Sequence, residues 1–187
     1  MKKGETSSRT KILAEIIVFT ALSAALYTMR PYSLPWGGAV TLGSMVPVMW
    51  LSLRRGTRIG FIAGAIFGVL ALFIDVVLLG ASAVVATPAQ VIFEYPTAFG
   101  VIGLTGVFHR KTVAFAVGGV AISVFIKFLI HYFVGVLVWP YFYTFPEEYG
   151  RWLWPAIYNG SFLAVEFIIS AILISVLVKR GTLEYAL

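Results

Sequence analysis

The chain is a succession of six apolar stretches joined by short connections, and this pattern limits the folds that it can adopt. The stretches cover residues 12–29, 39–53, 59–79, 84–108, 113–138 and 155–178. Hydrophobic residues make up 60% of the 187 residues and charged residues 12%, against about 25% charged residues in a soluble domain. A helix of about 20 apolar residues crosses the hydrocarbon core of a bilayer. We therefore expect an all-α, multi-pass protein of the cell membrane, with six transmembrane helices forming a single domain over residues 1–187.

The basic residues set the expected orientation. Eleven of the fourteen Lys and Arg residues lie at the ends of apolar stretches, in four clusters: Lys2, Lys3, Arg9 and Lys11; Arg54, Arg55 and Arg58; Arg110 and Lys111; Lys179 and Arg180. Six spans bring all four clusters to one side, which the positive-inside rule assigns to the cytoplasm, together with both termini. Clusters at span ends are not a basic face for nucleic acid, and the short connections leave no room for a soluble domain.

The first stretch, 12–29, has a competing interpretation as a signal peptide, because Lys2 and Lys3 precede it and small residues follow at Ala21 and Ser23. The segment before it is long and contains Glu5, and the stretch exceeds a usual signal-peptide core. We expect a retained helix. In the third stretch, glycine recurs every fourth residue at positions 60, 64 and 68, a spacing that lets helices approach closely in lipid.

Few ionisable residues lie inside the stretches, and such residues are functional candidates because their insertion into lipid is costly. They are Glu15, Asp75, Glu94, Lys127, His131 and Glu166. Snorkelling explains Glu15, near a span end, and structural pairing is the simpler expectation for Asp75 and Glu166. Lys127 and His131 are four residues apart, and Gly135 and Trp139 continue the row, so one helical stripe presents all four. Lys127 should then face a cavity or a counter-ion.

Glu94 lies in the sequence Phe93-Glu94-Tyr95-Pro96, where the proline frees backbone groups nearby. Its carboxylate could accept hydrogen bonds from a ligand amine or amidine, or form an internal salt bridge with Lys127. Aromatic residues gather near the outer ends of the spans: Trp36, Tyr95, Trp139, Tyr143, Trp152, Trp154 and Tyr158. They are either an interfacial belt or a cage for a flat cation. Asn159 adds an amide that can donate and accept.

The sequence argues against enzymatic chemistry. It contains no G-x-x-x-x-G-K-[S/T] phosphate loop and no H-E-x-x-H metal motif, and zero Cys excludes disulfides and thiolate metal sites. The stretch Glu147-Glu148-Tyr-Gly-Arg151 has the paired glutamates of membrane prenyl-peptidases, but its Arg is one residue too close and it lies in a loop. We therefore expect a binding or transport protein that is not an enzyme and needs no cofactor or metal.

Four motifs together resemble the ThiT family, the thiamine-binding S-components of energy-coupling factor (ECF) vitamin transporters. They are L-S-L-R-R-G at 51–56, F-E-Y at 93–95, K-x-x-x-H-x-x-x-G-x-x-x-W at 127–139 and Y-N-G at 158–160. Each motif is short, but the ordered set covers nearly the whole chain. The resemblance implies a six-helix, S-component-like bundle that binds thiamine and acts with a transmembrane coupling subunit and two ATPase subunits.

The resemblance also implies roles for individual residues. Glu94 would bind the aminopyrimidine, His131 and Trp139 would form a wall against the vitamin rings, and Tyr95 and Asn159 would assist. Trp36 would be a lid in the first loop, while Trp154, Lys127 and Tyr158 complete the expected ligand-binding set. Ala21 and Ala25 match a small-xxx-small face toward the coupling subunit.

The sequence departs from the family pattern where Trp154 replaces an expected tyrosine and Phe67 an expected tryptophan. Another vitamin, a related aminopyrimidine or a phosphorylated form therefore stays open as the ligand. A stand-alone proton-coupled transporter of flat aromatic cations is the functional alternative, since it could also use one membrane carboxylate inside an aromatic cage.

Overall fold

The computed structural model describes residues 3–108 and 112–181, with side chains from Arg9 onward. Seven α-helices appear in order: α1 (Lys3–Thr28), α2 (Val46–Arg55), α3 (Thr57–Phe73), α4 (Pro88–Ile92), α5 (Ala98–Gly100), α6 (Val113–Leu137) and α7 (Gly150–Lys179). Short 3-10 or π segments connect or extend them: η1 (Pro35–Gly37), η2 (Ile74–Leu78), η3 (Ser82–Val84), η4 (Phe93–Thr97), η5 (Val101–Gly106) and η6 (Trp139–Tyr141). Two antiparallel strands, β1 (Tyr32–Ser33) and β2 (Ala39–Val40), complete the described structure.

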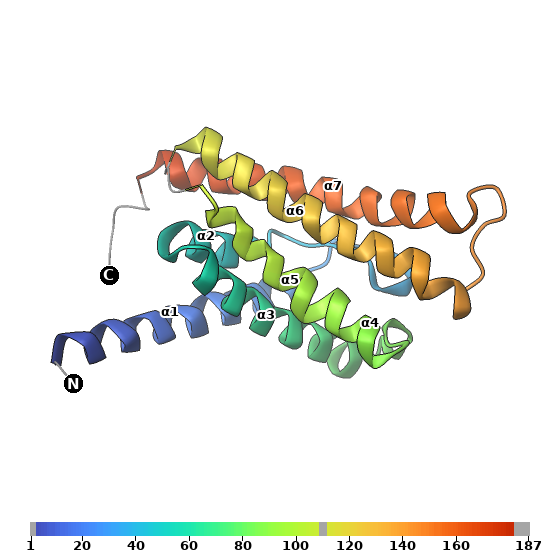
Figure 1. Cartoon of the computed structure of the whole chain (residues 1–187), viewed down its shortest axis with the longest axis horizontal. Coiled ribbons are helices and arrows are strands. Elements are labelled where there is room, and N and C mark those ends of the chain that lie inside the picture. Colours follow the sequence, from blue (N-terminus) through green and yellow to red (C-terminus); the bar gives the residue numbers. More distant parts are fainter. Residues whose placement is uncertain (1–2, 109–111, 182–187) are drawn as a thin grey trace.

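The helices form a bundle of six segments, which confirms the predicted all-α membrane class. In Figure 1, the long helices α6 and α7 run side by side, and α1 lies along the opposite edge of the bundle. Four described segments are long and apolar enough to cross a membrane: Arg9–Thr28, Thr57–Leu78, Val113–Tyr141 and Gly150–Lys179. The other two segments are α2, which is short, and the composite segment from α4 to η5, which changes its helical type along its length.

The second apolar stretch departs from the helix expected over residues 39–53. It begins as strand β2 and a turn, and α2 starts only at Val46. Gly43 has a φ of 80°, a left-handed conformation that stops a helix from extending through the turn. Pro47 lies in the first turn of α2, where its missing N–H leaves no hydrogen bond unmade. The residues between α1 and α2 therefore form a loop that contains η1 and the two short strands.

The fourth stretch is interrupted at its proline, as the sequence suggested. Pro96 lies inside the π-helical turn η4, which also contains Glu94 and Tyr95. A proline cannot donate to the preceding turn, and widening to a π-turn accommodates the lost bond. This local widening sets the direction in which the Glu94 side chain leaves the helix.

The glycines of α3 allow close approach, as their spacing predicted. A Cβ atom on Gly64 would collide with the carbonyl oxygen of Phe99, and one on Gly68 with that of Tyr95. On the facing segment, a Cβ on Gly103 would lie within 2.8 Å of the Cα of Phe61. The backbones of α3 and of the segment from η4 to η5 are therefore in direct contact, and they hold Glu94 and Tyr95 against a fixed support.

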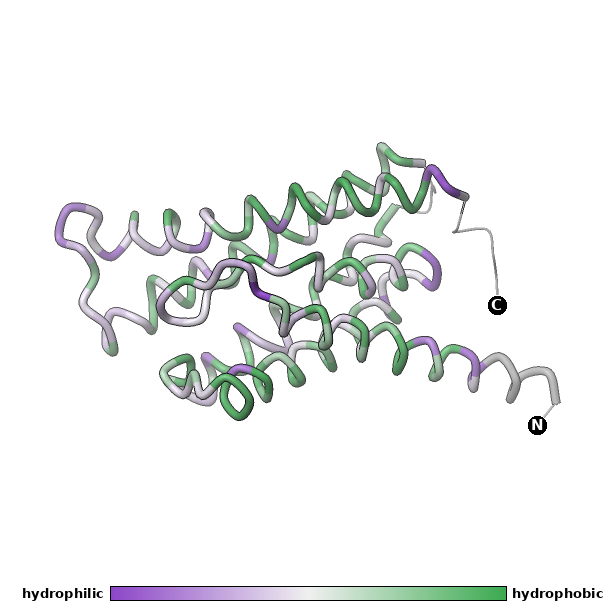
Figure 2. The backbone as a smooth tube through the Cα atoms, turned by 180° about the vertical axis from the view of Figure 1, so that it is seen from behind, coloured by the Kyte–Doolittle hydropathy of each residue, from purple (hydrophilic) through white to green (hydrophobic). Residues whose placement is uncertain are grey.

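Hydrophilic residues mark the two ends of the bundle, and most of the chain between them is apolar, with a few hydrophilic positions inside (Figure 2). The described basic residues of the N-terminal cluster, the α2–α3 turn and the end of α7 share one end. Arg110 and Lys111 of the third cluster lie outside the described residues. The gathering agrees with the predicted topology, and the assignment of that end to the cytoplasm stays a prediction.

Candidate ligand-binding site

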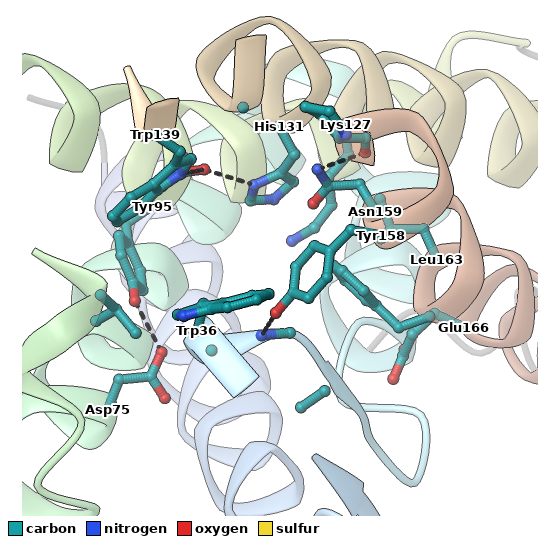
Figure 3. Close-up of a pocket in the computed structure, with 18 of the residues that line it drawn as sticks. Trp36, Asp75, Tyr95, Lys127, His131, Trp139, Tyr158, Asn159, Leu163 and Glu166 are labelled. Atoms are coloured by element: carbon teal, nitrogen blue, oxygen red, sulfur yellow. Dashed lines mark hydrogen bonds and ion pairs between the residues drawn. The ribbon is translucent and has the colours of Figure 1, made fainter. Parts of the chain in front are cut away.

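A cavity opens between α6, α7, the first loop and the segment around η4, and the predicted stripe on α6 lines it. Lys127, His131, Gly135 and Trp139 all contribute to its wall. A Cβ on Gly135 would lie 2.7 Å from the Cβ of Pro155, so glycine at this position allows α6 and α7 to approach each other beside the cavity. Figure 3 shows His131 and Lys127 along the upper side of the view, with Trp139 to their left.

Glu94 is held at this upper end by three polar neighbours. Trp139 Nε1 donates to Glu94 Oε1 at 3.1 Å, and Gln90 Nε2 donates to Glu94 Oε2. His131 Nδ1 lies 3.6 Å from Glu94 Oε1. Donors on two helices thus fix the carboxylate in one orientation at the cavity wall, which is the arrangement needed to receive an amine or amidine group.

The alternative of an internal salt bridge between Glu94 and Lys127 is not found among the described residues. The ammonium group of Lys127 instead lies over the ring of Phe99, with Nζ 3.1 Å from the ring centroid. The Lys127 side chain is buried, and a cation over an aromatic face gains an electrostatic attraction of about 2 kcal/mol when desolvated. Lys127 therefore does not neutralise Glu94 by direct contact.

Tyr95 lines the cavity, and its hydroxyl group is bound to Asp75, another residue of the cavity wall. Its Oη donates to Asp75 Oδ2 at 2.9 Å, and Tyr27 Oη donates to the same oxygen at 3.0 Å. Arg30 forms a salt bridge with Asp75 Oδ1. Asp75 is thus structurally paired, as expected, and the Tyr95 hydroxyl is committed to that pairing.

Five aromatic side chains from η1, η6, the loop after η6 and α7 line the cavity together: Trp36, Trp139, Tyr143, Trp154 and Tyr158. The ring centroid of Trp36 lies 5.5 Å from that of Tyr143, 5.8 Å from that of Tyr158 and 6.3 Å from that of Trp154. The rings of Trp139 and Tyr143 are 5.2 Å apart. Trp152 is 65% exposed and does not line this cavity. The five lining residues are thus placed where the cage interpretation needs them, whereas Trp152 is placed as a belt residue would be.

The first loop is fastened over the cavity by Tyr158. The Tyr158 hydroxyl accepts the N–H of Gly38 at 2.9 Å and donates to the carbonyl oxygen of Pro35. Between these two residues, Trp36 has a φ of 65°, which is a rare conformation for a side chain of its size. This strained turn places the indole ring beside Tyr158 of α7 (Figure 3) and near Tyr143 of the loop before α7.

All nine side chains expected to bind ligand line this one cavity. They are Trp36, Glu94, Tyr95, Lys127, His131, Trp139, Trp154, Tyr158 and Asn159. The amide nitrogen of Asn159 donates to the carbonyl oxygen of Pro155 at 2.9 Å, which leaves its oxygen and its second N–H available to a ligand. Their contact with a ligand remains a prediction.

The cavity also includes residues that sequence reasoning did not select for binding, among them Phe99, Thr41, Asp75 and Glu166. Asp75 and Glu166 could have been selected, because they are acidic residues inside apolar stretches. The local sequence contains no signal that indicates Phe99 or Thr41. Away from the cavity, Ala21 and Ala25 are exposed on α1. They leave a shallow strip on the helix, and its contact with a coupling subunit also remains a prediction.

The stretch Glu147–Arg151, which has the paired glutamates of membrane prenyl-peptidases, does not form a catalytic arrangement among the described residues. Glu147 and Glu148 are exposed in the loop before α7. The Arg151 guanidinium donates from Nε to the carbonyl oxygen of Val136 at 2.7 Å, so it joins α7 to the end of α6. The arrangement is a structural tie between two helices.

Comparison with known proteins decides the family. The model of the thiamine transporter protein family (Thia_YuaJ) matches residues 13–184. The chain belongs to this family. Two curated relatives are both called thiamine transporter ThiT. The one from Lacticaseibacillus paracasei is 27% identical over 89% of this chain and 86% of its own, and the one from Bacillus subtilis is 28% identical over 88% of each.

The fold agrees with this membership. The solved structure of ThiT from Listeria monocytogenes superposes with a TM-score of 0.78 at 26% identity, covering 94% of this chain and 98% of that chain. The relatives are named as transporters and not as enzymes, in agreement with the chemistry of the cavity. Membership and the apolar helices together identify a multi-pass protein of the cell membrane.

Proposed function

We propose that this protein captures thiamine as the high-affinity, substrate-binding subunit of an ECF-type importer. The observation that supports this most is the position of Glu94 in the cavity, fixed by Trp139 and Gln90 next to His131. A carboxylate held in this way suits the aminopyrimidine, and the aromatic faces nearby suit a flat, cationic thiazolium ring.

The transport step would depend on partners. The sequence contains no P-loop. By the family resemblance, ATP hydrolysis would come from two separate ATPase subunits that act through a transmembrane coupling subunit. The exposed strip at Ala21 and Ala25 is the proposed contact for that coupling subunit, because small residues allow close helix packing in lipid.

Calorimetric titration of the detergent-purified protein with thiamine tests the proposal. We expect tight binding by the parent and a loss of at least about tenfold in affinity for Glu94→Gln, because a hydrogen bond to a charged group contributes about 1.5–3 kcal/mol. Trp139→Ala should weaken binding at least as much, since it removes both an aromatic face and the Nε1 donor to Glu94.

Matched controls separate the cavity from general damage. Glu148→Gln changes an exposed loop carboxylate, and Trp152→Ala removes an indole that is 65% exposed, so both should bind thiamine like the parent. A folded parent that does not bind thiamine would refute the proposed ligand, and the titration would then pass to related aminopyrimidines and other vitamins.

Reconstitution into vesicles tests the dependence on partners. The purified protein alone should bind thiamine without accumulating it, and the coupling and ATPase subunits with ATP should restore accumulation. Accumulation by the protein alone, driven by a proton gradient, would instead support the stand-alone transporter of aromatic cations.

A further inference from the structure

A second carboxylate, Glu166 on α7, lines the same cavity and is only half satisfied. Its side chain is 3% exposed. The backbone N–H of Thr41 donates to Glu166 Oε1, and the Thr41 hydroxyl lies 2.8 Å from the same oxygen. Among the described residues, no hydrogen-bond partner reaches Glu166 Oε2, which is fully buried. Leaving a buried acceptor unsatisfied is costly, so the position needs a reason beyond packing.

Asp75 shows what a purely structural carboxylate looks like in this cavity. Both of its oxygens are occupied, Oδ1 by Arg30 and Oδ2 by Tyr27 and Tyr95, so that its charge is neutralised by an adjacent cation. Glu166 has no cation within salt-bridge distance among the residues that the structure describes. The Lys127 ammonium group sits over Phe99 instead.

The charged groups around the cavity therefore do not balance. With the carboxyl groups of Asp75, Glu94 and Glu166 ionised, Arg30 and Lys127 protonated and His131 neutral, the charges in and beside the cavity sum to minus one. Charges interact strongly in a cavity with a low dielectric constant. A ligand with a single positive charge would bring the total to zero, whereas an anionic ligand would increase the imbalance.

Glu94 and Glu166, neither of which forms a salt bridge with a Lys or Arg among the described residues, lie at different ends of the cavity. Figure 3 places Glu166 at the lower right of the view and Trp139 and His131, the neighbours of Glu94, along its top. A ligand that occupies the cavity would thus meet one carboxylate at its hydrogen-bonding end and a second at its other end.

Building on the proposed function, we propose that Glu166 is a specificity-determining carboxylate that selects the monocationic vitamin over its phosphorylated forms. The charge of Glu166 attracts the thiazolium end of thiamine and repels a phosphate attached there. Glu94 recognises the aminopyrimidine end, so the two carboxylates act on separate parts of the ligand.

The test compares three ligands, namely thiamine, thiamine monophosphate and a neutral isostere with thiophene in place of thiazolium. Titrations are made on the parent, on Glu166→Gln and on Ser170→Ala. Gln keeps the oxygen that accepts from Thr41 but removes the charge. Ser170 lies one turn further along α7, is buried, and its hydroxyl has no hydrogen-bond partner among the described residues, so its loss controls for changes in the helix.

The parent should prefer thiamine to both analogues. In Glu166→Gln, we expect the preference for thiamine over thiamine monophosphate to fall by about tenfold or more, as expected for loss of one nearby charge. The affinity for the neutral isostere should change by less than about threefold. Ser170→Ala should keep the ligand preferences of the parent.

Unchanged preferences in a folded Glu166→Gln variant would overturn the proposal. So would a parent that binds the neutral isostere as tightly as thiamine, a measurement that requires no variant. A folded parent that binds none of the three ligands would refute the proposed function itself, and with it this inference.

Discussion

Asp75 joins three elements through one side chain. It lies in the π-turn η2 that ends the third span, accepts from Tyr27 and Arg30 at the end of α1, and accepts from Tyr95 beside the cavity. The Arg30 and Asp75 side chains are 9% and 2% exposed, so water does little to screen their charges. The orientation of Tyr95, and through its backbone that of Glu94, depends on this buried pair.

Replacing Asp75 by Asn should destabilise the protein by about 3–5 kcal/mol, because it leaves the Arg30 guanidinium buried without its counter-charge. The measurement is the free energy of unfolding in detergent. The double variant Asp75→Leu with Arg30→Met should recover much of the loss, since two apolar groups bury no unpaired charge. Equal losses in Asp75→Asn and in the double variant would show that the unpaired charge on Arg30 is not the cause of the destabilisation.

At the scale of elements, α3 and the segment from η4 to η5 form the support of the cavity. Gly68 faces the backbone of Tyr95 and Pro96, with no side chain between them. The π-turn η4 thus packs directly against α3. This contact between two backbones fixes the position of Glu94, which lies in η4.

Gly68→Ala should lower stability by about 1–3 kcal/mol, because the added methyl would lie 2.9 Å from the Cα of Pro96 and force the backbones apart. Thiamine affinity should fall in the same variant, since Glu94 moves with η4. Gly160→Ala is the matched control: its methyl would lie 3.8 Å from the nearest atom, on Phe128, so stability and binding should stay near those of the parent. A Gly68→Ala variant with the parent's affinity would contradict the link between this contact and the site.

At the scale of the whole molecule, the predicted topology places the α2–α3 turn in the cytoplasm and the loop before α7 outside. The natural chain has no Cys, so single cysteines report position without background. In intact cells, an impermeant maleimide should label Glu148→Cys and should label Thr57→Cys only after permeabilisation. The reverse pattern would invert the orientation of the bundle.

Much of the fold could be predicted because it is encoded locally. The apolar stretches fix the helices, glycines four residues apart indicate close approach, and the spacing of Lys127, His131 and Trp139 puts them on one face. The predicted start of the second helix at residue 39 is wrong. Hydropathy alone does not show that Gly43 and Pro47 prevent a helix from starting before Val46. The site was predictable where its residues share one helical face or match family motifs.

The remaining contacts had no local signal. Asp75 meets Arg30, which lies 45 residues earlier, and Glu166 meets Thr41, which lies 125 residues earlier. Such pairs form only after the helices have packed, and periodicity within one helix carries no information about them. The sequence therefore indicated that these acids were unusual without showing which of them was neutralised.

The direct backbone contact between α3 and the segment from η4 to η5 has a consequence for how the protein can evolve. Most substitutions at Gly64, Gly68 or Gly103 would separate the two segments, so this half of the cavity has little freedom to vary. The wall formed by α7 and the first loop meets the cavity through side chains, which can be exchanged one at a time. Drift toward a different vitamin would therefore begin at positions such as Thr41 and Glu166, while the glycine face stays the same.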